Sequence, residues 1–167
     1  STERALGTLR SGSLDPVFGA FFTNDTGSTI TSLNISYTGE EWRLGSAGRT
    51  DHLNVEYQVG ASEGDLLTGA WTSVAALNFL TPDIANTGAK DGNSVFSILS
   101  GTITGLSIAP GASFAIRWTD SDASSSDDGL AVDNFALSAS GSTPANNVIG
   151  GITILAEADS LHGAVGA

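Results

Sequence analysis

Apolar and polar residues alternate along several short segments of this chain, a pattern typical of half-buried β-strands. The clearest example is the segment 52–59, HLNVEYQV, in which every second residue from Leu53 onward is apolar. Residues 33–38 (LNISYT) and 114–119 (FAIRWT) repeat the pattern. Further strands are expected near residues 3–9, 16–23, 71–80, 95–106, 130–138 and 147–156.

Turn-forming residues separate these segments, at 24–27 (NDTG), 45–48 (GSAG), 91–93 (DGN) and 110–111 (PG). Strands at this spacing predict an all-β fold, an antiparallel β-sandwich of jelly-roll type with about 8–10 strands. The one candidate helix is a short stretch around residues 155–162. The apolar phase slips between Val132 and Phe135, which predicts a β-bulge near Asp133.

The chain divides into one domain and an extension. Its 167 residues suffice for a single core, and no apolar run is long enough for a membrane-spanning helix. We expect the sandwich over residues 1–139 and a small, polar linker over 140–147. A strand-like apolar extension is expected over 148–167.

The charge is strongly acidic, with 18 Asp and Glu against 6 Lys and Arg and a net charge of −12. This balance disfavours binding to nucleic acid or to anionic membranes and favours divalent cations. The absence of Cys excludes disulfides and thiolate zinc sites. A surface rich in Thr, Ser, Asn, Gly and Asp is typical of exported bacterial proteins. A chain that begins at Ser1 is interpreted as a mature form whose targeting segment has been removed, so we expect an extracellular location.

The strongest local signal is a loop rich in aspartate. It contains Asp120, Asp122, Asp127 and Asp128, and Asp133 follows in the next strand. Carboxylate, hydroxyl and carbonyl oxygens are the ligands that Ca²⁺ prefers, so these five residues are candidate calcium ligands. The spacing does not match an EF-hand. The alternative is a solvated loop whose aspartates cap turns.

Signals for catalysis are weak. Glu40 and Glu41 are adjacent on an expected strand and point to opposite faces, so they cannot flank one glycosidic bond. The two histidines, His52 and His162, are far apart, and no G-x-S-x-G motif is present. We expect a non-enzymatic protein, with a metal-dependent enzyme at the acidic loop as a lesser hypothesis. Trp71 follows a loop and is a candidate sugar-binding residue, although core packing is the expected role of all three tryptophans.

Several segments resemble a known bacterial domain. They are ERALGTLRSGS (3–13), FTNDTGSTITSLNISYTGEEWRLG (22–45), GRTDHLNVEYQV (48–59), TGAWTSVAALNF (68–79), ITGLSIAPGASFAIRWTD (103–120) and DDGLAVDNFALS (127–138). Over residues 1–139 the chain is similar to an extracellular domain of secreted and surface proteins. That domain often accompanies C-terminal sorting signals or exported nuclease and phosphatase domains. The resemblance implies a jelly-roll-like sandwich without catalytic residues, used as a carbohydrate-binding or adhesion module.

Two departures from that family suggest assembly. The family usually has strand-forming sequence ahead of the ERALG segment, and this chain adds an apolar segment after its final family strand. An apolar strand on a linker can fill an open groove in its own domain or in a neighbour. We therefore expect a structural subunit of a filament or surface layer, joined to copies of itself by strand exchange. The alternative is a carbohydrate-binding or adhesion module, with or without a dependence on calcium. The candidate assembly residues are Val148, Ile149, Ile152, Ile154 and Leu155.

Overall fold

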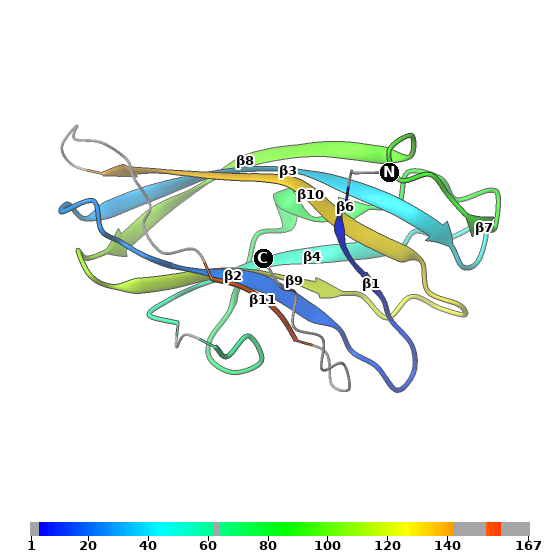
Figure 1. Cartoon of the computed structure of the whole chain (residues 1–167), viewed down its shortest axis with the longest axis horizontal. Coiled ribbons are helices and arrows are strands. Elements are labelled where there is room, and N and C mark those ends of the chain that lie inside the picture. Colours follow the sequence, from blue (N-terminus) through cyan, green and yellow to red (C-terminus); the bar gives the residue numbers. More distant parts are fainter. Residues whose placement is uncertain (1–3, 62–63, 142–152, 158–167) are drawn as a thin grey trace.

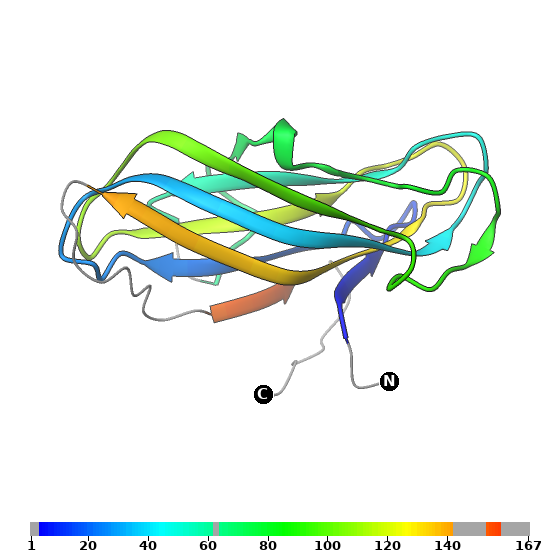
Figure 2. The same ribbon diagram turned by 90° about the horizontal axis from the view of Figure 1, so that it is seen from above.

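The structure is a computed structural model, and it describes residues 4–61, 64–141 and 153–157. Two antiparallel β-sheets are stacked face to face, as the two ribbon views show (Figure 1, Figure 2). The predicted all-β sandwich is therefore confirmed. Among the described residues, no helix is long and apolar enough to span a membrane.

The first sheet has five strands and is built around β3. Its members are β1 (Leu6–Leu9), β10 (Gly129–Gly141), β3 (Ile30–Leu44), β8 (Phe96–Ile108) and β7 (Gly88–Ala89). β10 lies between β1 and β3, and β3 pairs on its other side with β8 and, near its end, with β7.

The second sheet has six strands and is built around β9 and β4. Its members are β11 (Thr153–Glu157), β2 (Val17–Thr23), β9 (Ser113–Asp120), β4 (His52–Val59), β5 (Thr72–Ser73) and β6 (Phe79–Leu80). They follow the order β11-β2-β9-β4-β5, and β6 also pairs with β4. β11, the last strand of the part of the chain that the structure describes, therefore forms one edge of this sheet.

The core lies between the sheets and is filled by the residues that the alternation predicts. Leu33, Ile35 and Tyr37 of β3 face Phe114, Ile116 and Trp118 of β9, and all six are buried. Trp118 stacks on Phe18 and meets Tyr37 edge to face, with ring centroids 5.6 and 5.5 Å apart. Trp118 is thus a core residue, as expected, whereas Trp42 has 37% of its surface exposed, contrary to the expectation of core packing.

The predicted bulge is present in β10. Its register with β3 shifts between Asp133 and Ala136, and Asn134 adopts a positive φ of 51°. The shift accounts for the change of apolar phase, because residues on either side of the bulge still reach the same core.

Two local predictions differ from the structure. Residues 71–80 were expected to form one strand, but the 3₁₀ helix η1 (Ala75–Leu77) separates β5 from β6. Its Ala-Ala-Leu sequence lacks alternation. On either side of it, the Asn78 side chain accepts a hydrogen bond from the Val55 amide, and the Val74 amide donates one to the Val55 carbonyl. The helix expected over 155–162 is wrong for residues 155–157, which lie in β11, and residues 158–162 lie outside the described residues.

The predicted domain boundary shifts slightly. β10 continues to Gly141, so residues 140 and 141 of the expected linker belong to the last strand of the first sheet. The remainder of that linker lies outside the described residues.

Candidate functional site

The side of β2 that pairs with β11 in the second sheet, called the β2 edge, is the first candidate site. Val17 to Phe22 are all buried, because both faces of β2 are covered. Phe18, Ala20 and Phe22 face the main core, whereas Val17 and Phe21 join a second cluster with Leu66 on the outer face of the sheet. Such a strand, apolar on both faces, is typical of the interior of a sheet rather than its edge.

The C-terminal strand gives β2 its second neighbour. β9 pairs with one edge of β2, and β11 pairs antiparallel with the other, from Thr153 opposite Phe21 to Glu157 opposite Val17. Two candidate assembly residues lie in this strand: Ile154 is opposite Ala20, and Leu155 is opposite Gly19. Val148, Ile149 and Ile152 lie outside the described residues.

Loss of β11 would leave one edge of β2 without a partner along five residue positions, while β9 still pairs with the other edge. An antiparallel ladder makes about one hydrogen bond per residue pair, and each contributes about 0.5–1.5 kcal/mol net. The hydrogen bonds of the β11 ladder therefore contribute about 2.5–7.5 kcal/mol before the cost of ordering the tail. The uncovered side of β2 would be a template for another strand.

A second candidate site lies at the end of the sandwich where β9 meets the acidic loop. We call Asp51, Asp120, Asp127, Asp128 and Arg49 the acidic cluster; its four carboxylate side chains are buried. Asp128 accepts a hydrogen bond of 2.7 Å from the Gly45 amide and lies 3.3 Å from the Arg49 guanidinium. Asp51 accepts bonds from the amides of His52 and Asp128 and lies 3.6 Å from Arg49. Arg49 thus joins two buried carboxylates.

Asp120 is the member of the acidic cluster whose buried carboxylate has a carboxylate oxygen without a hydrogen-bond partner among the described residues. Its Oδ2 accepts a 2.6 Å hydrogen bond from the Thr8 hydroxyl, but its buried Oδ1 has no hydrogen-bond partner among the described residues. Burial, above all, raises the pKa of this carboxyl to about 7, and the charges of Asp51 and Asp127 act in the same direction. Burial also raises the pKa of Asp51.

The predicted calcium ligands have different surroundings. Asp127 accepts a 3.1 Å bond from the Ala123 amide, and its backbone carbonyl accepts one from Arg43. Asp122 is exposed and lies 3.7 Å from Arg10, whereas Asp133 is half-buried and bonds Asn134. Over residues 4–61 and 64–141, no three acidic or histidine side chains are grouped to hold a metal ion. Calcium binding at this loop stays a prediction.

The paired glutamates on β3 serve separate contacts. Glu40 accepts a 2.9 Å bond from the Trp42 indole, and Glu41 accepts a 3.0 Å bond from the Asp83 amide. Both are buried, and burial raises the pKa of Glu41. Each carboxylate therefore anchors a neighbouring part of the fold. His162 lies outside the described residues.

Trp71, the candidate sugar-binding residue, is half-buried against the outer face of the second sheet. The Arg117 guanidinium lies over its ring, 4.1 Å from the centroid, and its indole nitrogen donates to the Thr68 carbonyl. Arg117 is itself held by Glu56 at 2.6 Å. One face of the Trp71 ring is thus occupied by a residue of its own chain.

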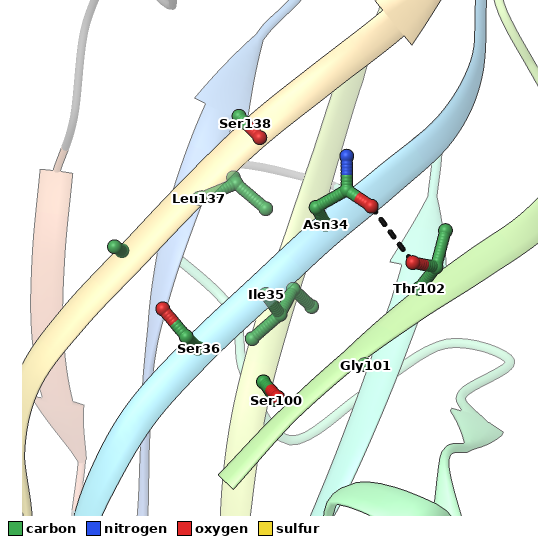
Figure 3. Close-up of a pocket in the computed structure, with 9 residues that line it drawn as sticks. Asn34, Ile35, Ser36, Ser100, Gly101, Thr102, Leu137 and Ser138 are labelled. Atoms are coloured by element: carbon green, nitrogen blue, oxygen red, sulfur yellow. Dashed lines mark hydrogen bonds between the residues drawn. The ribbon is translucent and has the colours of Figure 1, made fainter. Parts of the chain in front are cut away.

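A shallow groove runs along the outer face of the first sheet (Figure 3). Its volume is about 360 Å³, and the Asn34 side chain accepts a 2.7 Å hydrogen bond from the Thr102 hydroxyl there. The lining is small and mostly polar, and it comprises Asn34, Ile35, Ser36, Ser100, Gly101, Thr102, Ala136, Leu137 and Ser138. Sequence analysis did not identify this groove, since its residues come from three strands that are distant in the chain.

Comparison with protein-family models, curated proteins and solved structures finds no match to this chain. Functional inference therefore rests on the geometry of the β2 edge, the acidic cluster and the groove.

Proposed function

We propose that this chain is a non-catalytic structural subunit of the bacterial cell exterior, which assembles with copies of itself by exchanging its C-terminal strand. The observation that carries the proposal is the pairing of β11 with β2. A strand with two apolar faces receives its second neighbour from β11, which follows β10 after eleven intervening residues, 142–152.

The length of that connection supports exchange. Eleven residues can extend to about 36–40 Å, more than the width of a small sandwich domain. The strand 153–157 can therefore pair with the β2 edge of its own chain, as in this structure, or with that of a neighbour. The backbone contacts are the same in both cases, so exchange adds connectivity without a new interface.

The sequence supports a structural role outside the cell. The acidic surface keeps copies soluble until a specific contact forms, and the resemblance to bacterial surface domains implies the same compartment. Repeated donation from each subunit to the next would give an open, head-to-tail polymer.

Electron microscopy tests this proposal. The intact chain is compared with a form that ends after Gly141, which retains all of β10. Two matched variants are Ile154→Pro and Leu155→Pro: successive backbone N–H groups of a strand point to opposite sides, so one of these prolines removes a bond to β2. We expect filaments from the intact chain and none from the truncated form. One proline variant should impair assembly more than the other. Dispersed particles from the intact chain at every concentration would refute the proposal.

The second candidate function is a carbohydrate-binding or adhesion module. It is favoured by the groove on the first sheet, whose hydroxyl and amide groups can bind saccharide hydroxyls. A glycan array with the Asn34→Ala and Trp71→Ala variants tests it. Binding lost in Asn34→Ala would support the groove, and binding lost in Trp71→Ala would support the ring; no binding to any saccharide would refute this function.

A further inference from the structure

The outer edge of the first sheet is formed by β8. In both ribbon views β8 is the long strand at the border of this sheet, beyond β3 (Figure 1, Figure 2). β8 is thirteen residues long and pairs with β3; on its other edge no strand pairs with it among the described residues. A long unpaired edge is a template for another strand unless the sequence opposes pairing.

The sequence of β8 lacks the residues that usually oppose pairing. The strand reads FSILSGTITGLSI, with no Pro and none of the chain's charged residues. The charge-free run continues from Gly92 to Ile116, although the chain as a whole has a net charge of −12. Copies of so acidic a protein repel one another, and this edge is a place where two copies can approach without opposing like charges.

The exposed side chains of β8 also suit pairing. Ile98 has 76% of its surface exposed and Phe96 has 45%, and both are on the outward face with Ser100, Thr102 and Thr104. Aromatic and β-branched residues placed opposite each other on neighbouring strands stabilise a sheet.

We propose that two copies of this chain pair through their β8 edges, antiparallel about a two-fold axis at Ser100. We place the centre of the pairing at the middle of the regular part of β8. Its pairing with β3 runs without a shift from Phe96 to Thr104, and Ser100 is the midpoint of that segment. The axis places Ser100 opposite its own copy, Ile98 opposite Thr102 and Phe96 opposite Thr104. The two first sheets then form one continuous sheet across the dimer. This contact is separate from strand exchange at β2, on the other sheet.

Single cysteines test the register, because the chain has no native Cys. Residues opposite each other in an antiparallel pair have Cα atoms about 4.5–5.5 Å apart, within the range of a disulfide. Under mild oxidation, Ser100→Cys should give a covalent dimer on a denaturing, non-reducing gel. Thr104→Cys, on the same exposed face, should stay monomeric alone and give the heterodimer when mixed with Phe96→Cys. Denaturation dissolves any polymer formed by strand exchange, so the gel reports on β8 alone.

A surface charge tests the interface itself. Ile98→Lys changes an exposed residue and should leave the fold intact, as circular dichroism can verify. In sedimentation experiments the dissociation constant of the dimer should rise at least tenfold in Ile98→Lys. In the unaltered chain it should fall with added salt, which screens the net charge. A monomer at every concentration would overturn the proposal. So would equal cross-linking of Ser100→Cys and Thr104→Cys, or a dissociation constant that Ile98→Lys leaves unchanged.

Discussion

Asp120 makes this protein less stable as the pH rises, and Asp120→Asn should remove that effect. In the unfolded chain the carboxyl loses its proton near its ordinary pKa of 3.8, whereas in the folded chain burial raises the pKa to about 7. Between these values the folded state holds the extra proton, so the free energy of unfolding falls as the pH rises. Below both values, and above both, Asp120 makes no further contribution to the slope.

The magnitude follows from the shift in pKa. Each unit corresponds to 1.36 kcal/mol, so a rise from 3.8 to about 7 costs about 4 kcal/mol of stability once the carboxylate is ionised. Asparagine has no charge to bury and can still accept the Thr8 hydrogen bond. Its amide group gains no partner, which costs about 1–2 kcal/mol. We therefore expect Asp120→Asn to stabilise the fold by about 2–3 kcal/mol at about pH 8 and to bring no gain at about pH 4.

Urea unfolding followed by tryptophan fluorescence measures this difference. Asp122→Asn is the matched control: the same chemical change two residues away, on an exposed carboxylate, should alter stability by less than about 0.5 kcal/mol at either pH. In Asp120→Asn the free energy of unfolding will still fall somewhat as the pH rises, because burial also raises the pKa of Asp51 and Glu41. The reasoning is wrong if Asp120→Asn keeps the full slope of the unaltered protein, or if it is the less stable protein at the higher pH.

Three further outcomes are expected. Arg49→Met should lower the free energy of unfolding by about 3–5 kcal/mol in urea, since it leaves Asp51 and Asp128 buried without their cation; a loss below about 1 kcal/mol would contradict the buried pairing. Gly45→Ala should cost about 1–3 kcal/mol, because a Cβ there would lie 2.1 Å from the Ser126 carbonyl oxygen, while Gly12→Ala, with open space around it, should cost far less. If the acidic loop binds calcium, a hundredfold excess over Kd should add about 2.7 kcal/mol and raise Tm, reversibly with chelator; an unchanged Tm would mean that the loop is purely structural.

The regular part of the fold could be predicted from the sequence because strand burial has a period of two. Leu33, Ile35 and Tyr37 are buried as their spacing predicts, and the slip of phase located the bulge at Asp133. The burial of Val17 to Phe22 on both faces of β2 could not be predicted in this way. A continuous apolar run has no alternation that indicates which side faces the core.

The acidic cluster could not be predicted in the same way, because long-range contacts determine it. Asp128 is buried by Gly45 and Arg49, about eighty residues earlier in the chain, and the sequence gives no local sign of that packing. A loop with so many aspartates is ordinarily solvated, so the sequence suggested either a solvent-exposed loop or a calcium site. The exposure of Trp42 was missed for a related reason: its neighbours are the loop residue Gly92 and the carboxylate of Glu40 rather than the core.

The central claim is that the C-terminal strand of one copy pairs with β2 of another, and a paired cysteine variant tests it most directly. Ala20 and Ile154 are opposite each other in the β2–β11 register, so Ala20→Cys combined with Ile154→Cys can form a disulfide across this pair. The protein is oxidised after assembly and run on a denaturing, non-reducing gel. Strand exchange predicts a ladder of covalent oligomers, whereas each single variant gives none. A band at the monomer position alone, with its disulfide formed within one chain, would show that the strand completes its own domain and would contradict assembly by exchange.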